Sequence, residues 1–185
     1  MPFTRSATVL REGRGAWLSG TMTDPAALTE HDREWLRRCV DLAAEALDAG
    51  DEPFGSILVS ADGSELFADR NRVAGGDPTQ HPEFAIARWA AQHLSPAERT
   101  AATVYTSGEH CPMCAAAHAW VGLGRIVYAS STAQLTGWLA QWDVPAGPVA
   151  ALPVHTVAPG IEVAGPDAEL SARVRALQAR ARGVG

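Results

Sequence analysis

The sequence predicts an α/β fold in which a largely parallel sheet is covered by helices on both faces. Two observations predict it: a hairpin of two short strands near the start, and a regular alternation of helical and extended segments after it. Such alternation implies parallel strands joined by crossover helices, and the hairpin adds antiparallel character. The chain has 185 residues, 46% of them hydrophobic and 19% charged, which suits one domain with a sizeable core.

The first helix is the most clearly delimited element. It begins at Thr29–Asp32, which resembles a capping box, and apolar residues follow at helical spacing until Gly50. A hairpin over 54–60 and 64–71 comes next, because two short runs flank the turn sequence Ala-Asp-Gly. The remaining expected elements are a helix over 83–94, a strand over 102–107, a helix from 111 to about 122, a strand over 125–130, a helix over 132–142, one or two extended segments within 152–163, and a helix over 167–181.

Residues 1–28 lack periodicity, so we expect a flexible leader there and a single domain over 29–185. The formal net charge is −6, whereas a protein that binds nucleic acid through its phosphates is expected to be basic. No apolar run reaches the roughly 18 residues of a membrane span, and no secretory signal is recognisable. Three cysteines suit a reducing compartment. We therefore expect a cytoplasmic protein that binds neither nucleic acid nor membranes.

Two cysteines at the start of a helix indicate a metal site. Cys111 and Cys114 are three residues apart, and the positive end of the helix dipole favours the thiolates that bind zinc. His81 precedes another helix and is the best third ligand among the six histidines. Three protein ligands leave one position for water, which is typical of a catalytic zinc. Glu83 would lie close enough to move the protons of that water.

These residues resemble the zinc-binding signature of the cytidine deaminase superfamily. His-Pro-Glu at 81–83 is followed, 30 residues after its histidine, by Cys-Pro-Met-Cys at 111–114. The segments "PFGSILV", "NRVAGGDPTQHPE" and "VYTSGEHCPMCAAAHAW" extend the likeness over roughly residues 33–145. It is closest to the branch that contains bacterial guanine deaminases and tRNA adenosine deaminases.

The resemblance implies a fold, a cofactor and a set of roles. The fold would be a three-layer α/β/α arrangement around a central five-stranded mixed sheet, and the protein would be a homodimer. One Zn²⁺ per chain would be bound by His81, Cys111 and Cys114, with Glu83 as the catalytic proton shuttle. Substrate-binding roles would fall to Asn71, Phe54, Trp120 and Asp143.

Two positions depart from the family's usual pattern. Pro82 stands where the family has alanine, and a proline is tolerated in the first turn of a helix because its missing N–H would be unpaired there. His110 stands where the family has proline, directly before Cys111, and so could place a polar group in the pocket.

The activity that the resemblance implies is hydrolytic deamination of a small aromatic heterocycle, with release of ammonia. Guanine is the first candidate, followed by cytosine-like bases and aminotriazines. A tRNA adenosine deaminase is the alternative among enzymes. Outside enzymes, His118 could close a structural zinc site with His81 and the two cysteines, or the cysteine pair could be a redox motif.

Overall fold

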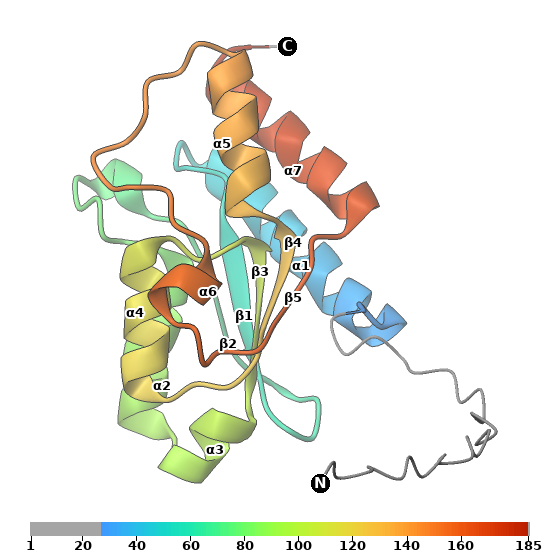
Figure 1. The fold of residues 1–185 in the computed structure, drawn as a ribbon, viewed down its shortest axis with the longest axis vertical. Coiled ribbons are helices and arrows are strands. Elements are labelled where there is room, and N and C mark those ends of the chain that lie inside the picture. The colour runs from blue at the N-terminus through green and yellow to red at the C-terminus, as the bar shows by residue number, and fades with distance from the viewer. Residues whose placement is uncertain (1–26, 185) are drawn as a thin grey trace, which may run out of the picture.

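The structure is a computed structural model that describes residues 27–184, so most of the expected leader lies outside the described residues. Figure 1 shows that the described strands form one sheet and that the helices surround it. The helices are α1 (Glu30–Asp48), α2 (Pro82–His93), α3 (Pro96–Ala101), α4 (Pro112–Val121), α5 (Thr132–Gln141), α6 (Val154–Val157) and α7 (Ala168–Ala181). The strands are β1 (Gly55–Val59), β2 (Glu65–Arg70), β3 (Thr103–Gly108), β4 (Ile126–Ser130) and β5 (Val163–Ala164). None of the described helices is both long and apolar enough to cross a bilayer.

The five strands form a mixed sheet in the order β2-β1-β3-β4-β5. β1 pairs antiparallel with both β2 and β3, whereas β3–β4 and β4–β5 are parallel. The five-stranded mixed sheet is therefore confirmed: β2, β3, β4 and β5 run in one direction, and β1 of the hairpin runs against them. The crossover through α2 connects β2 to β3, and β1 lies between these two strands and runs against both.

Helices cover both faces of the sheet, which confirms the three-layer arrangement. On one face, α1 and α7 pack on the sheet, where Leu36 and Val174 belong to the same core cluster as Ile57. On the other face, α2 packs on β1 and β2, with Ile86 and Leu58 in a second cluster. Figure 1 shows α1 and α7 on one side of the sheet and α2 and α4 on the other.

The start of α1 confirms the predicted capping box. Thr29 accepts a hydrogen bond from the backbone N–H of Asp32 at 3.0 Å, and Asp32 accepts one from the backbone N–H of Thr29 at 2.9 Å. Gly50, at φ +88°, ends the helix as expected. α1 lies very close to β1 at Gly55, where a Cβ atom would come within 2.4 Å of the Cβ atom of Leu42. This close approach fixes the position of β1 against α1.

Two short elements differ from the expectation. α3 was not predicted, because its six residues are too few for periodicity, although Ser95 and Glu98 form a capping box at its start. The segment 152–163 was expected to be extended, but it contains the single helical turn α6, and only its last residue belongs to a strand. The carboxylate of Glu109 accepts from the N–H of Val154 and so stabilises this turn from outside the segment.

Candidate active site

The predicted ligands lie at the starts of two helices. His81 is the N-cap of α2, and Pro82 is the first helical residue, where its missing N–H leaves no bond unmade. Cys111 is the N-cap of α4, and Cys114 lies in the first turn of that helix. Because α2 and α4 pack against each other, their N-termini bring these side chains together.

The three ligand atoms stand at the distances that a tetrahedral ion requires. Nδ1 of His81 is 3.7 Å from Sγ of Cys111 and 3.6 Å from Sγ of Cys114, and the two sulfurs are 3.5 Å apart. Ordinary zinc–sulfur and zinc–nitrogen bond lengths place such atoms about 3.5 to 3.8 Å from one another. Two thiolates and one imidazole are also a donor set that zinc prefers. These residues therefore fit one Zn²⁺ ion.

The protonation of the three ligands is coupled. A hydrogen bond with Cys114 lowers the pKa of Cys111 to about 4. The same hydrogen bond, together with burial, raises the pKa of Cys114. The hydrogen bond with Cys111 raises the pKa of His81. A metal ion that binds all three must displace the protons held by Cys114 and His81, so we expect zinc affinity to fall as the pH is lowered.

Glu83 lies beside this cluster in the first turn of α2 and is 5% exposed. Its Oε1 accepts hydrogen bonds from the hydroxyls of Ser56, at 2.8 Å, and Thr106, at 3.0 Å. These two residues are partners in the β1–β3 pairing, so the sheet holds the carboxylate in place. Burial raises the pKa of Glu83, while the charge of His81 and the hydrogen bond from Ser56 oppose the rise. A carboxyl group tuned in this direction suits proton transfer near neutral pH.

A cavity of about 180 Å³ opens next to Glu83 and the ligands. Its wall combines aliphatic side chains, the phenyl ring of Phe54 and two carboxyl groups. The lining residues are Phe54, His81, Glu83, Glu109, Cys111, Pro112, Thr132, Leu135, Thr136, Leu139, Val149, Ala150 and Ala151. No Lys or Arg is among these described residues. The cavity therefore offers no cationic side chain to an anionic ligand.

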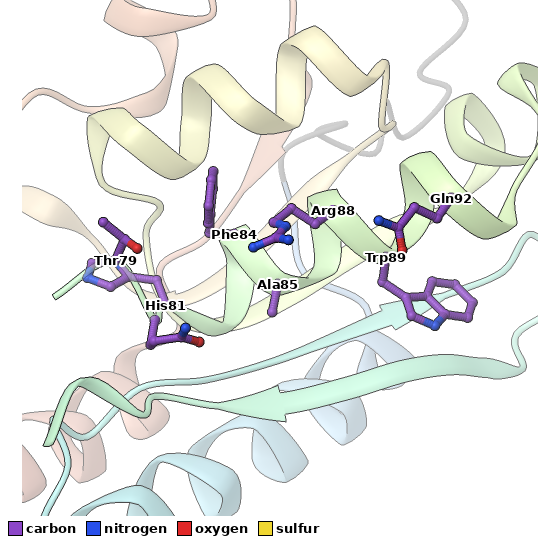
Figure 2. A pocket seen from close by; sticks show the side chains of 8 residues that line it. Thr79, His81, Phe84, Ala85, Arg88, Trp89 and Gln92 are labelled. Carbon is purple, nitrogen blue, oxygen red and sulfur yellow. The ribbon is translucent and has the colours of Figure 1, made fainter. Parts of the chain in front are cut away.

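A second hollow, of about 230 Å³, lies along the outer surface of α2. Figure 2 shows Phe84, Arg88 and Trp89 among the side chains around it, with His81 at one end. Although this hollow is larger, neither Glu83 nor either of the two cysteines lines it. We therefore assign the chemistry to the smaller cavity.

His118 does not belong to the metal cluster. Its Nε2 lies 2.8 Å from the carbonyl oxygen of Gly124, and among the described residues the cluster consists of His81 and the two cysteines. The geometry thus contradicts the closed structural site that His118 would complete. His110 is buried and does not line the cavity; its ring packs edge-on against His118 at 5.3 Å. Burial keeps the pKa of His110 well below its ordinary value.

Two of the predicted substrate residues lie at one end of β1 and β2. Phe54 lines the cavity, and its carbonyl accepts from the backbone N–H of Asn71 at 3.0 Å. Asn71 is fully buried, and its Oδ1 accepts from the N–H of Val73. Its Nδ2 has no hydrogen-bond partner among the described residues. Asn71 is not among the residues that line the cavity, although a buried amide with a spare donor suits a ligand acceptor. Both substrate-binding roles stay predictions.

The structure does not bring the other two predicted substrate residues to the cavity. Trp120 is 90% exposed on α4, six residues after Cys114, so its side chain projects about 120° round the helix from that ligand. It lines a separate hollow with residues 157–161. Asp143 is exposed just after α5, at φ +53°. Neither residue lines the cavity of its own chain.

Reasoning from the sequence missed several residues of the site. Ser56 and Thr106 belong to buried strands, and the only signal of Ser56 is a hydroxyl within an otherwise apolar run. Glu109 and the α5 residues Thr132 and Leu135 line the cavity without any recognisable pattern. Their roles depend on tertiary contacts across the sheet.

The sequence matches the profile of the cytidine and deoxycytidylate deaminase zinc-binding region over residues 29–130. A probable cytosine deaminase of Schizosaccharomyces pombe is 34% identical over 108 residues, which are 58% of this chain and 65% of that protein. A guanine deaminase of Bacillus subtilis is 37% identical over 98 residues, 52% of this chain and 62% of that protein. A tRNA-specific adenosine deaminase of Haemophilus influenzae is 29% identical over 105 residues, 56% of this chain and 60% of that protein. Each match thus spans less than two thirds of the relative's length.

Two solved structures are similar to this fold. The guanine deaminase of Bacillus subtilis superposes with a TM-score of 0.50 at 30% identity, over 65% of this chain and 82% of that chain. A guanine deaminase from Nitrosomonas europaea superposes with a TM-score of 0.58 at 20% identity, over 80% of this chain and 83% of that chain, which shows the fold alone. The matched profile contains the three ligands and Glu83, at the start of two helices that pack together. The chain therefore belongs to the cytidine and deoxycytidylate deaminase family.

Proposed function

We propose that this protein is a zinc-dependent hydrolytic deaminase of a small, uncharged aromatic heterocycle. The observation that carries the proposal is the three-ligand cluster with Glu83 beside it, both opening on one cavity. A structural zinc site has no use for a buried carboxylate next to the ion, whereas hydrolysis needs a group that moves protons. Water and the amino-substituted ring carbon would yield a carbonyl and ammonia.

Zinc, when bound, lowers the pKa of water to about 7 and so supplies hydroxide at neutral pH. Glu83 takes up the proton that the water loses and delivers it to a ring nitrogen of the substrate. A further proton passes through the same carboxylate to the amino group, which leaves as ammonia. Ser56 and Thr106 hold Oε1 of Glu83 by hydrogen bonds, so the carboxylate keeps one orientation during these transfers. Phe54 supplies a flat surface for the ring.

The cavity favours a free base over a nucleotide. Its volume of about 180 Å³ is below the roughly 300 to 1,000 Å³ of sites for drug-sized ligands. Glu83 and Glu109 line it, so the negative charge of a phosphate would be repelled. Guanine is our first candidate and cytosine the second, because relatives named guanine deaminase and cytosine deaminase match this sequence. Aminotriazines have the same ring chemistry and come next.

Deamination of adenosine in tRNA is the second candidate function, because relatives named as tRNA-specific adenosine deaminases also match. The formal net charge of −6 and the acidic cavity count against a polyanionic substrate. We further propose a homodimer, which the family resemblance implies. A cytoplasmic location agrees with three cysteines that are all free.

Ammonia release from the zinc-loaded full chain tests the proposed function. The panel contains guanine, cytosine, adenine and an aminotriazine, together with cytidine, a cytidine monophosphate and a tRNA anticodon stem-loop. We expect release from at least one free base and much slower release from the nucleotide and the RNA. A Cys114→Ser variant without zinc serves as the blank. If only the RNA releases ammonia, the protein is a tRNA adenosine deaminase. If no compound releases ammonia, deamination is refuted.

A further inference from the structure

Glu109 lines the cavity, but the reaction described above gives it no role. It follows β3 and lies two residues before the ligand Cys111. Its backbone N–H donates to the carbonyl of Ser130 at 2.8 Å, which extends the pairing of β3 with β4 by one residue. The backbone of Glu109 is therefore fixed both to the sheet and to a metal ligand.

The two carboxylate oxygens of Glu109 hold two segments that are distant in the sequence. Oε2 accepts from the backbone N–H of Thr132 at 2.7 Å, and Oε1 accepts from the backbone N–H of Val154 at 2.8 Å. Thr132 is the first residue of α5 and Val154 the first residue of α6. Both hydrogen bonds are short and charge-assisted, and a carboxylate is favoured at the start of a helix.

The two segments that Glu109 holds also form part of the cavity wall. α5 contributes four lining residues between Thr132 and Leu139, and the stretch 149–151 shortly before α6 contributes three more. The side chain of Glu109 links both segments to the cysteine-bearing loop. α6 also packs on α4, where Val154 and Ala115 belong to one core cluster, so the carboxylate adds to a contact that already holds this part of the wall near Cys111.

We propose that Glu109 is a positioning residue that holds this wall at the width of a single ring. The inference rests on the proposed deamination for the identity of the substrate. Both carboxylate oxygens must accept a hydrogen bond, and only an ionised carboxylate provides two acceptors without a donor. In Glu109→Gln the amide nitrogen would face a backbone N–H, so one of the two wall segments would be released.

Steady-state kinetics of Glu109→Gln, on the best base of the panel, tests the proposal in the zinc-loaded full chain. We expect KM to rise about tenfold or more, kcat to change much less, and zinc to stay at one per chain. Glu98→Gln is the matched control, because Glu98 likewise accepts from a backbone N–H at a helix start, that of Ser95 at 2.8 Å, but lies outside the cavity. An unchanged KM in Glu109→Gln would overturn the proposal.

Hydrogen–deuterium exchange provides a readout that needs no substrate. The amides at the start of α5 and over 149–154 should exchange faster in Glu109→Gln than in the wild type, and at the wild-type rate in Glu98→Gln. If no base is deaminated, the proposed function fails, while exchange still decides the role of Glu109. If both segments exchange at the same rate in Glu109→Gln as in the wild type, that role is overturned. If Glu109→Gln does not fold, Glu109→Asp replaces it. The aspartate keeps the charge but is too short to reach both amides, so the two segments should again exchange faster than in the wild type.

Discussion

At the start of α2, Glu83 is enclosed by the ligand His81 and by the hydroxyls of Ser56 and Thr106. The two hydroxyls donate to the same carboxylate oxygen, so the other oxygen keeps its lone pairs for exchanging protons. Burial and the neighbouring imidazole act in opposite directions on the pKa of Glu83. The proposed proton-shuttle role therefore depends on side chains from β1, β3 and the start of α2.

Replacing Glu83 with Gln tests this role, because the amide keeps the shape of the side chain but cannot take up a proton. We expect kcat/KM for the best base to fall by a factor of about 10² to 10⁴, with one zinc still bound per chain. Activity assays and metal analysis on the same preparation give both quantities. Glu65→Gln, an exposed carboxylate on β2, is the control and should remain fully active. A Glu83→Gln variant as active as the wild type would contradict the assignment.

Sequence and structure agree best on the residues whose chemistry is local. His81 and the two cysteines are recognisable because each stands at a helix start and zinc restricts its ligand types. The partners of Glu83 are not recognisable, because Ser56 and Thr106 meet it only when β1 and β3 pair. Such contacts join residues distant in the sequence and leave no spacing to detect.

At the scale of elements, Asp32 links the first helix to the sheet. Besides capping α1, its Oδ1 accepts from the hydroxyl of Tyr105 on β3 at 3.0 Å and from Arg125, next to β4, at 3.1 Å. Burial alone would raise the pKa of Asp32, but the hydrogen bonds from Thr29 and Tyr105 and the charge of Arg125 lower it below its ordinary value. A lowered pKa means that the carboxylate stabilises the folded chain above its unfolded pKa of about 4. This stabilisation is lost as the pH falls through the folded pKa.

Urea unfolding of Asp32→Asn checks this link. At pH 7 we expect the free energy of unfolding to fall by about 2 kcal/mol or more, because a buried acceptor of several hydrogen bonds is lost. The difference from the wild type should shrink as the pH is lowered below about 4, since Asp32 then becomes protonated in the wild type as well. Asp41→Asn, which breaks only an exposed ion pair with Arg173, should change stability by less than about 1 kcal/mol. An equal deficit of Asp32→Asn at both pH values would contradict the argument.

The elements that the sequence predicts well are those with their own start and stop signals. α1 has its capping box and Gly50, and the hairpin has its turn. α3 and α6 have four to six residues, too few for a periodic pattern. β1 pairs antiparallel with β3, and the sequence does not predict this, because each strand would show the same periodicity in a parallel pair.

At the scale of the whole molecule, the outer face of α4 is the most conspicuous surface. Trp120 is 90% exposed there, beside a hollow lined by Ala116, Ala119 and residues 157–161. A large exposed aromatic side chain is typical of a protein–protein contact. We therefore propose that Trp120 lies at the interface of the proposed homodimer, since it does not line the cavity of its own chain.

Sedimentation of the full chain tests the proposed homodimer and this face together. We expect the wild type to sediment as a dimer and Trp120→Ser to dissociate at concentrations at least about tenfold higher, because a buried tryptophan at an interface contributes more than about 2 kcal/mol. Leu152→Ser, at a side chain that is 40% exposed and does not line the hollow beside Trp120, should leave the dimer intact. A wild type that is monomeric at every concentration, or a Trp120→Ser dimer of unchanged affinity, would contradict the proposal.

X-ray absorption spectroscopy of the zinc in the purified wild-type chain tests the central claim most directly, because it counts the atoms bound to the ion. The account predicts one zinc per chain with two sulfur atoms at about 2.3 Å, one imidazole nitrogen, and one oxygen from solvent. The same spectrum should appear in His118→Ala, since His118 is engaged with Gly124. A shell of two sulfurs and two imidazole nitrogens that changes in His118→Ala would show a closed structural site and contradict the account.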